Sequence, residues 1–149
     1  METIRVLFVC IHNSGRSQMA EAFLNKYGKG NFIAESAGLE AGTLNPVVVD
    51  ALEEIGIDIS TNKTKDVFDF YKAGKRFNYV ITVCDESNAE RCPIFPGTIE
   101  KLHWSFRDPA AIEGSYKAKL NGTRVIMNEI KDKITNWIEE ISIKYSGIE

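Results

Sequence analysis

Four short apolar runs alternate with segments of helical periodicity along this chain, and this alternation constrains the fold more than any other feature of the sequence. The runs cover residues 4–9, 32–36, 79–83 and 102–104. The first and third are rich in β-branched and aromatic residues, which is typical of strands buried on both faces of a parallel sheet. Strands that alternate with helices predict an α/β fold with a doubly wound, four-stranded parallel sheet, right-handed crossovers and helices on its faces.

Helices are predicted between these strands and after the last one. The first is expected to end at Gly28, a residue that suits a C-terminal cap. The second is expected to begin at Asn45-Pro46, because proline is favoured in the first helical position, and to end at Gly56. A short third helix is expected over residues 66–72.

The clearest helix lies near the C-terminus, where apolar residues keep a three-to-four spacing for about five turns. Its buried stripe consists of Ile126, Ile130, Ile134, Trp137, Ile138, Ile141 and Tyr145. The only long irregular regions are expected at 84–101 and 105–122. Because no internal repeat, low-complexity stretch or linker interrupts the chain, residues 1–149 are predicted to form a single domain.

The charge and the distribution of apolar residues exclude several classes of protein. The net charge is -3, whereas proteins that bind nucleic acid usually show a basic surface. No apolar run approaches ~20 residues, so no segment is expected to span a membrane. The first apolar stretch is too short for the core of a signal peptide. Three cysteines, an odd number, fit poorly with a secreted disulfide scaffold. These features predict a cytoplasmic protein.

Reactive residues fall where the predicted strands end. Cys10 follows the first strand, Cys84 follows the third, and a polar segment follows Trp104 at the end of the fourth. In doubly wound sheets, functional sites lie at the carboxyl ends of the strands. Free cysteines are often simply buried, so composition alone leaves their role open. Their position in the sequence favours a functional site.

The segment between the first strand and the first helix contains a Cys-x5-Arg motif that runs from Cys10 to Arg16. A tight loop that ends at a helix N-terminus directs several backbone N–H groups at one point, which makes a nest for a tetrahedral oxyanion. Arg16 supplies a planar fork that can hold two oxygens of the anion. The same positive field favours the thiolate form of Cys10, to which Ser17 can donate a hydrogen bond. The predicted anion-binding residues are Ile11, His12, Asn13, Ser14, Gly15, Arg16 and Ser17.

The stretch VCIHNSGRSQMAEA, residues 9–22, resembles the arsenate reductases that share the fold of low-molecular-weight protein tyrosine phosphatases, a phosphotyrosine-phosphatase-I-like fold. Phosphatases of this fold usually have proline where this chain has Gln18, and aromatic residues where it has Ala110-Ala111. Many arsenate reductases have a further cysteine at the position of Gly15, but that residue is not part of their cysteine relay. The resemblance extends over nearly the whole chain, through Glu35-Ser36-Ala37-Gly38, Asn45-Pro46, Asp58-Ile59-Ser60, Cys92-Pro93 and His103-Trp104.

The resemblance implies a thioredoxin-dependent arsenate reductase that contributes to arsenical resistance. Cys10 would attack arsenate, Cys84 would attack Cys10 and release arsenite, and Cys92 would then attack Cys84. Thiols can supply the two electrons by forming a disulfide, and thioredoxin would reduce the final Cys84–Cys92 bond. Asp108, in an Asp-Pro pair, would be the general acid; on its own, that pair is a common turn. Phosphate and sulfate are expected to compete with arsenate.

The spacing of the last two cysteines departs from the resemblance. Seven residues separate Cys84 from Cys92, whereas well-known members of the family have six. If the segment between them were helical throughout, the two Cα atoms would lie about 12 Å apart along the axis. A disulfide requires them within roughly 7 Å. We therefore expect the segment to be irregular or to unwind when the bond forms.

No cofactor is expected to be required, and metal binding has weak support. The cysteines and His103 lack the short spacing of structural zinc sites. Some relatives bind potassium beneath the loop, and the matching positions here are Asn13, Glu21, Ser36 and Asp66. Such polar residues also brace loops without an ion, so both interpretations stay open. His12 could likewise contact substrate or simply be a solvated loop residue.

Two other functions remain open. A low-molecular-weight protein tyrosine phosphatase would need only Cys10, Arg16 and Asp108, because water completes its cycle. An oxyanion- or redox-sensing module could use the same loop without catalysis. The two additional cysteines argue against the phosphatase, and Asp108 argues against the sensing module.

Overall fold

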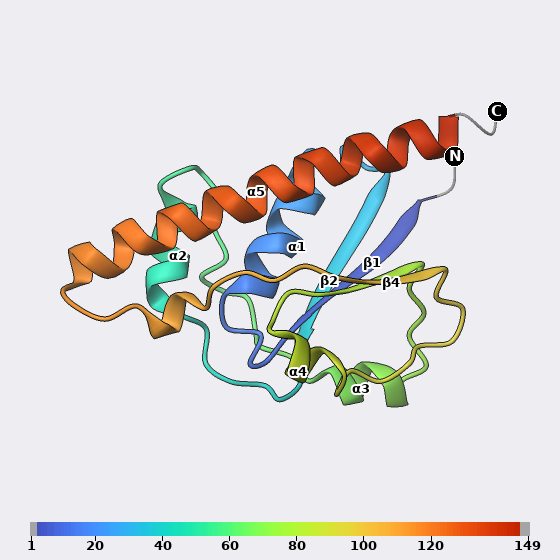
Figure 1. The fold of residues 1–149 in the computed structure, drawn as a ribbon, viewed down its shortest axis with the longest axis horizontal. Coiled ribbons are helices and arrows are strands. Elements are labelled where there is room, and N and C mark those ends of the chain that lie inside the picture. The colour runs from blue at the N-terminus through green and yellow to red at the C-terminus, as the bar shows by residue number, and fades with distance from the viewer. Residues whose placement is uncertain (1–2, 147–149) are drawn as a thin grey trace.

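The computed structural model describes residues 3–146 and contains a four-stranded sheet with the strand order β2-β1-β3-β4 (Figure 1). Every neighbouring pair of strands is parallel. The predicted doubly wound sheet is therefore confirmed. The second strand runs two residues further than expected, and the fourth begins two residues earlier. The strands span Ile4–Cys10 (β1), Phe32–Gly38 (β2), Tyr79–Thr82 (β3) and Glu100–His103 (β4).

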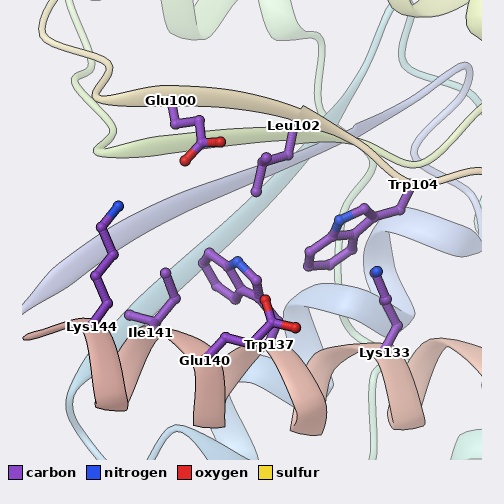
Figure 2. Close-up of a pocket in the computed structure, with 8 residues that line it drawn as sticks. All are labelled: Glu100, Leu102, Trp104, Lys133, Trp137, Glu140, Ile141 and Lys144. Carbon is purple, nitrogen blue, oxygen red and sulfur yellow. The ribbon is translucent and has the colours of Figure 1, made fainter.

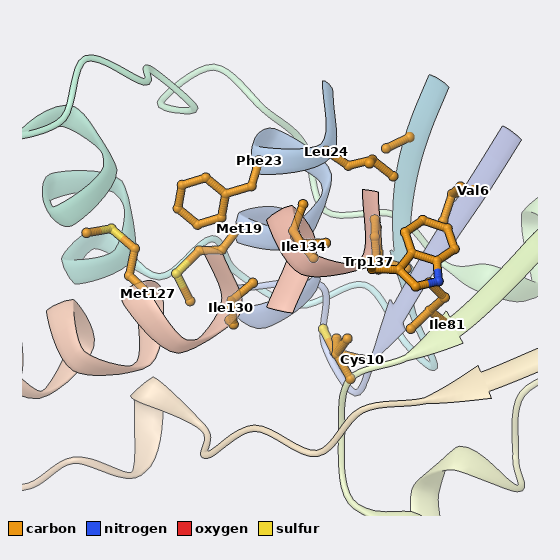
Figure 3. Packing of buried hydrophobic residues seen from close by; sticks show 14 of the residues in the cluster. Val6, Cys10, Met19, Phe23, Leu24, Ile81, Met127, Ile130, Ile134 and Trp137 are labelled. Atoms are coloured by element: carbon orange, nitrogen blue, oxygen red, sulfur yellow. The ribbon is translucent and has the colours of Figure 1, made fainter. Parts of the chain in front are cut away.

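Alternate residues of β1 point to opposite faces of the sheet, and each face carries its own apolar cluster. Val6 and Phe8 belong to the larger cluster, which also contains Ala89 of the one-turn helix α4 (Glu86–Ala89) and apolar side chains of three longer helices. These helices are α1 (Arg16–Tyr27), α2 (Pro46–Glu53) and α5 (Tyr116–Ser146). Figure 3 shows Met19 of α1 beside Ile130 and Ile134 of α5 in this cluster.

The second face is covered more thinly. Leu7 and Val9 of β1 pack there against α3 (Val67–Lys72) and against Phe77 and Phe95. Figure 1 shows α3 on the opposite side of the sheet from α1 and α5. The two clusters matter for function because the residues at the carboxyl ends of the strands are divided between them.

A pair of tryptophans fills the space between β4 and α5 (Figure 2). The ring centroids of Trp104 and Trp137 lie 5.6 Å apart, nearly perpendicular, and the Lys133 ammonium lies 5.3 Å from the centre of the Trp104 ring. The shallow pocket that these side chains line contains none of the predicted site residues. Trp137 therefore has the core role expected for the stripe on the last helix.

The prediction that residues 105–122 are irregular is wrong for their second half, because α5 begins at Tyr116. Its first turns lack an apolar stripe and are held by polar contacts. Ser115 Oγ accepts a hydrogen bond from the backbone N–H of Ala118 at 3.1 Å. The Arg124 guanidinium donates to both carboxylate oxygens of Glu54 beyond the end of α2. Tertiary contacts thus extend the helix where local periodicity gives no signal.

Two short elements interrupt the other regions that were expected to be irregular. The segment after β3 contains a one-turn helix, α4 (Glu86–Ala89), and the segment after β4 contains a 3-10 turn, η1 (Pro109–Ala111). Asp85 and Asp108 cap these elements through their side chains. Within residues 3–146, no helix combines the length and the apolar character needed to cross a membrane.

Candidate active site

Cys10 is the last residue of β1, and Arg16 is the first residue of α1. The intervening loop wraps around the Cys10 sulfur, which is almost fully buried (Figure 3). The backbone N–H of Asn13 donates to Cys10 Sγ at 3.1 Å, and Ser17 Oγ lies 2.8 Å from the same sulfur. These two contacts, one from the loop backbone and one from the first turn of α1, fix the position of the sulfur atom at the edge of the sheet.

The loop adopts a strained path that the surrounding backbone requires. Asn13 has a φ of 56°, in the left-handed region where asparagine is one of the better tolerated residues. Gly38, which pairs with Cys10 across the sheet, lies directly beneath the loop. A Cβ atom on Gly38 would come within 2.7 Å of the backbone nitrogen of Asn13. The glycine in the Ala37-Gly38 pair therefore permits the close approach of the loop.

Arg16 faces the segment that carries the proposed acid. One of its nitrogens donates to the carbonyl oxygen of Phe106 at 3.1 Å, and another lies 3.7 Å from Asp108 Oδ2. The guanidinium is almost fully buried, whereas Asp108 is partly open to solvent. Asp108 Oδ1 accepts from the backbone N–H of Ala110 at 2.9 Å, which fixes the carboxyl at the start of η1. The structure thus brings Cys10, Arg16 and Asp108 to one edge of the sheet.

Of the remaining predicted loop residues, Ser14 and Gly15 contribute backbone, whereas the side chain of Ile11 packs against the larger cluster. Ser14 accepts a hydrogen bond from the backbone N–H of Asn45 at 2.9 Å through its carbonyl oxygen. Gly15 lies so close to Val48 that an added Cβ would be 3.3 Å from that side chain. The exposed His12 ring pairs with Glu40, with Nδ1 and Oε1 3.1 Å apart, at the rim of the loop. This contact gives His12 a partner outside the nest.

The other two cysteines lie on opposite faces of the sheet. Cys84, just beyond β3, packs in the same cluster as Cys10, whereas Cys92 packs with Val80 and Phe95 in the other cluster. All three are free thiols. The intervening segment is not irregular throughout, because Glu86–Ala89 form one turn of helix. A Cys84–Cys92 disulfide therefore requires the chain between them to move.

Burial sets the ionisation of both of these thiols. It raises the pKa of Cys84, an effect that the nearby positive charge of Arg16 partly offsets. Burial raises the pKa of Cys92 to about 11, with Lys101 acting in the opposite direction. Cys92 Sγ lies 3.5 Å from the carbonyl oxygen of Pro93, its own neighbour. Cys92 is thus a protonated thiol at neutral pH in this conformation.

The raised pKa of Cys92 predicts a loss of stability in alkali. The folded protein binds this proton more tightly than the unfolded chain, so the stabilisation is complete below pH 9 and is lost as the pH rises to about 11. The expected loss is about 2–3 kcal/mol of the free energy of unfolding. Urea unfolding under reducing conditions from pH 8 to 11 measures it. Cys92→Ala should show a shallower decline, and identical slopes for the two proteins would contradict the assignment.

The four positions matched to potassium fit a cation only in part. Ser36 donates its hydroxyl to Glu21 at 3.1 Å, and burial raises the pKa of Glu21, so a cation there would stabilise the carboxylate. In contrast, Asn13 Oδ1 already accepts two hydrogen bonds, and Asp66 accepts from the backbone N–H of Phe68. Potassium binding therefore stays a prediction. Elsewhere in residues 3–146, no group of three or more His, Cys, Asp or Glu side chains is arranged to hold a metal ion.

Sequence reasoning missed the residues that support the loop from below. Gln18 is fully buried and contacts both Asn13 and the segment 62–65. It also missed the chain Thr82–His103–Ser105 at the ends of β3 and β4, in which His103 Nδ1 lies 2.7 Å from Thr82 Oγ1 and its Nε2 lies 3.0 Å from Ser105 Oγ. These contacts join distant parts of the chain, so no spacing of residues in the sequence predicts them.

Comparison with known proteins agrees with this geometry. The family described as low molecular weight phosphotyrosine protein phosphatase matches residues 5–146. An arsenate reductase from Bacillus subtilis is 37% identical over 142 residues, which cover 95% of this chain and 97% of that protein. The structure of an arsenate reductase in the phosphate binding state has a TM-score of 0.74 and 29% identity over 93% of this chain and 99% of its own. A thioredoxin-dependent arsenate reductase from Corynebacterium glutamicum has a TM-score of 0.68 and 31% identity, and the match covers 97% of this chain and 64% of that one.

Proposed function

The chain belongs to the low molecular weight phosphotyrosine protein phosphatase family and, within it, to the arsenate reductases, and we propose that it reduces arsenate to arsenite through Cys10, Cys84 and Cys92. The observation that carries this proposal is that Cys10 and Cys84 are buried in one cluster at one edge of the sheet, close enough to Arg16 for its charge to act on Cys84. A hydrolase has no use for the second thiol.

The first step is attack by the Cys10 thiolate on the arsenic atom of arsenate. The loop N–H groups and Arg16 hold the anion, and a sulfur–arsenic bond forms as one oxygen leaves. Arg16 already touches the carbonyl of Phe106 and the carboxylate of Asp108, so it links the anion site to the acid. Phosphate and sulfate have the same tetrahedral shape and are expected to compete for the site.

Asp108 is proposed to protonate the departing oxygen so that it leaves as water. Asp108→Asn should slow formation of the Cys10 adduct about 10²–10³-fold while anion binding stays within a few fold of wild type. Single-turnover kinetics, with phosphate affinity measured separately, test this. If the single-turnover rates of Asp108→Asn match those of wild type across pH, Asp108 is not the general acid and serves only to form the turn. Asp85→Asn is a matched control, since Asp85 caps α4 as Asp108 caps η1.

The second step transfers two electrons to arsenic. Cys84 sulfur attacks Cys10 sulfur, the sulfur–arsenic bond breaks, and its electron pair stays on arsenic, which leaves as arsenite. Cys84 loses its proton in this step. Burial raises the pKa of Cys84 while the Arg16 charge lowers it, so the same guanidinium that binds the anion also assists ionisation of the second thiol. The product is a Cys10–Cys84 disulfide.

In the third step Cys92 attacks Cys84 and releases the Cys10 thiolate. This step needs the segment 85–91 to unwind, because Cys92 starts in the cluster on the opposite face. The contacts that must break include the Asp85 cap, the hydrogen bonds from the Cys92 N–H and from Lys101 Nζ to the Ala89 carbonyl at 3.3 and 3.4 Å, and the packing of Ala89 in the larger cluster. Leaving the apolar cluster would return the pKa of Cys92 from about 11 towards 9, which gives about 100-fold more thiolate at neutral pH. Movement and activation thus occur together.

A thioredoxin-type dithiol is proposed to reduce the Cys84–Cys92 disulfide, which returns two electrons to the enzyme. The surface beside Cys92 supports a protein partner, because its apolar side chains are unusually open. Ile94, two residues from Cys92, is 84% exposed, and the half-exposed Tyr71 ring meets Phe95 edge-on at 5.9 Å. Exposed apolar side chains in a group are typical of an interaction site. A cytoplasmic location is proposed with this partner, because thioredoxin keeps protein thiols reduced in the cytosol.

The alternative function is phosphatase activity, which Cys10, Arg16 and Asp108 could support alone. One comparison separates the two: arsenate-dependent oxidation of NADPH in the presence of thioredoxin and its reductase, beside hydrolysis of an aryl phosphate. We expect arsenate turnover to dominate. Efficient phosphate ester hydrolysis without arsenate-dependent NADPH oxidation would establish the phosphatase instead.

A further inference from the structure

Gln18 is a buried polar residue that has no role in the chemistry described above. Its side chain is fully buried in the first turn of α1. The amide nitrogen lies 3.0 Å from Asn13 Oδ1 and 3.2 Å from the carbonyl oxygens of Asn13 and Lys63. The amide oxygen accepts from Asn62 Nδ2 at 3.1 Å. A buried polar side chain with this many partners braces the backbone around it.

Gln18 and the backbone of Lys65 together fix which way the Asn13 amide points. Asn13 Oδ1 accepts from Gln18 and from the backbone N–H of Lys65 at 3.0 Å, so the oxygen end of the amide is held on that side. The nitrogen end must then face Ser17, where Nδ2 donates to Oγ at 2.8 Å. Because Ser17 Oγ accepts there, its own proton is free to point at Cys10 Sγ, 2.8 Å away.

We infer that Gln18 is a positioning residue for the nucleophile: it begins a directed chain of hydrogen bonds, through Asn13 and Ser17, that ends on the Cys10 thiolate. The donors run in one direction, from the Gln18 amide to Asn13, from Asn13 to Ser17, and from Ser17 to Cys10. Asn13 and Ser17 are fully buried as well, so no water competes with the chain. The hydrogen-bond partners of Gln18 are Asn13, Asn62 and Lys63, so it acts on Cys10 through its neighbours.

Removal of the Gln18 donor should reduce the fraction of Cys10 present as thiolate. Methionine has a similar length and volume but no N–H group, so Gln18→Met removes the hydrogen bonds with little change in packing. We expect peptide-resolved alkylation of Cys10 by iodoacetamide at pH 6–7 to slow about three- to tenfold, and its pH profile to move to higher pH. A merely structural residue would leave that profile in place.

Two further variants sharpen the test. Gln18→Lys restores N–H donors toward the three oxygens, so its Cys10 should be alkylated at least as fast as in wild type. Alkylation as slow as in Gln18→Met would overturn the proposal. If Gln18→Met does not fold, alkylation of Gln18→Lys more slowly than wild type would overturn it instead. Ser17→Ala cuts the chain at its last link. Gln18→Met should therefore add little to Ser17→Ala, whereas additive effects would show that Gln18 does not act through Ser17.

Asn25→Leu provides a matched control on the same helix. The Asn25 amide also braces α1, against both backbone groups of Ala34 at 2.8 and 3.1 Å, but it has no contact with the loop. It should lower stability without changing the alkylation of Cys10. The inference rests on Cys10 being the nucleophile, yet alkylation is measured without arsenate. If the cysteine relay fails, the alkylation result still tests the role of Gln18. A wild-type pH profile for Cys10 alkylation in Gln18→Met would overturn the role of Gln18 and leave the relay untouched.

Discussion

Replacing Cys10 with serine is expected to abolish arsenate reduction, with a loss of about 10⁴-fold or more in turnover. A hydroxyl at this position is not ionised at neutral pH, so the contacts from Asn13 and Ser17 would have no thiolate to stabilise. The variant also lacks the sulfur that Cys84 must attack. The coupled NADPH assay measures the loss, and aryl-phosphate hydrolysis should disappear with it, because both reactions begin with the same nucleophile.

The loop itself should survive this change. Serine is smaller than cysteine but polar, and the backbone N–H groups and Arg16 stay in place, so phosphate should bind Cys10→Ser with affinity within a few fold of wild type. Calorimetric titration with phosphate is the control for folding and for the site. Substantial arsenate turnover by a well-folded Cys10→Ser protein would remove Cys10 from the mechanism.

Cys84→Ser is expected to separate the two activities of the site. Arsenate turnover should fall below detection, because the electron pair of the sulfur–arsenic bond can reach arsenic only when a second sulfur attacks Cys10. Aryl-phosphate hydrolysis should stay within a few fold of wild type, since Cys10, Arg16 and Asp108 are untouched and water completes that reaction. The ratio of the two activities measured on one preparation is the readout.

The Cys92→Ser variant serves as a control for the effect of Cys84→Ser on arsenate turnover. Cys92→Ser should allow one turnover and then stall as a Cys10–Cys84 disulfide that thioredoxin reduces poorly. Loss of arsenate reduction and of aryl-phosphate hydrolysis together in Cys84→Ser would mean that the substitution had damaged the site. Sustained arsenate reduction by that variant would exclude Cys84 as the second thiol.

The features that the sequence predicted are those with a local physical cause. The buried runs specify parallel strands because each is apolar on both faces, and Cys10-x5-Arg16 specifies an anion loop because the motif joins a strand to a helix. The meeting of Cys10, Cys84 and Asp108 at one sheet edge followed from the rule that parallel strands share a carboxyl end.

The features that the sequence did not predict depend on contacts between distant segments. Cys84 and Cys92 pack on opposite faces of the sheet because the chain between β3 and β4 passes from one face to the other. No pattern in the sequence near Cys92 indicates this change of face. Gln18 reaches Lys63 across 45 positions. The first turns of α5 rest on polar contacts such as that between Arg124 and Glu54. Each requires the assembled fold before it can be seen.

Identification of the disulfides left after one arsenate turnover tests the cysteine relay most directly. The reduced protein is mixed with one equivalent of arsenate without thioredoxin, free thiols are trapped by alkylation, and the peptides are mapped by mass spectrometry. The relay predicts a Cys84–Cys92 disulfide with Cys10 alkylated, and a Cys10–Cys84 disulfide in Cys92→Ser. Recovery of Cys84 and Cys92 as free thiols after arsenite has been released, with sustained turnover by Cys92→Ser, would contradict it.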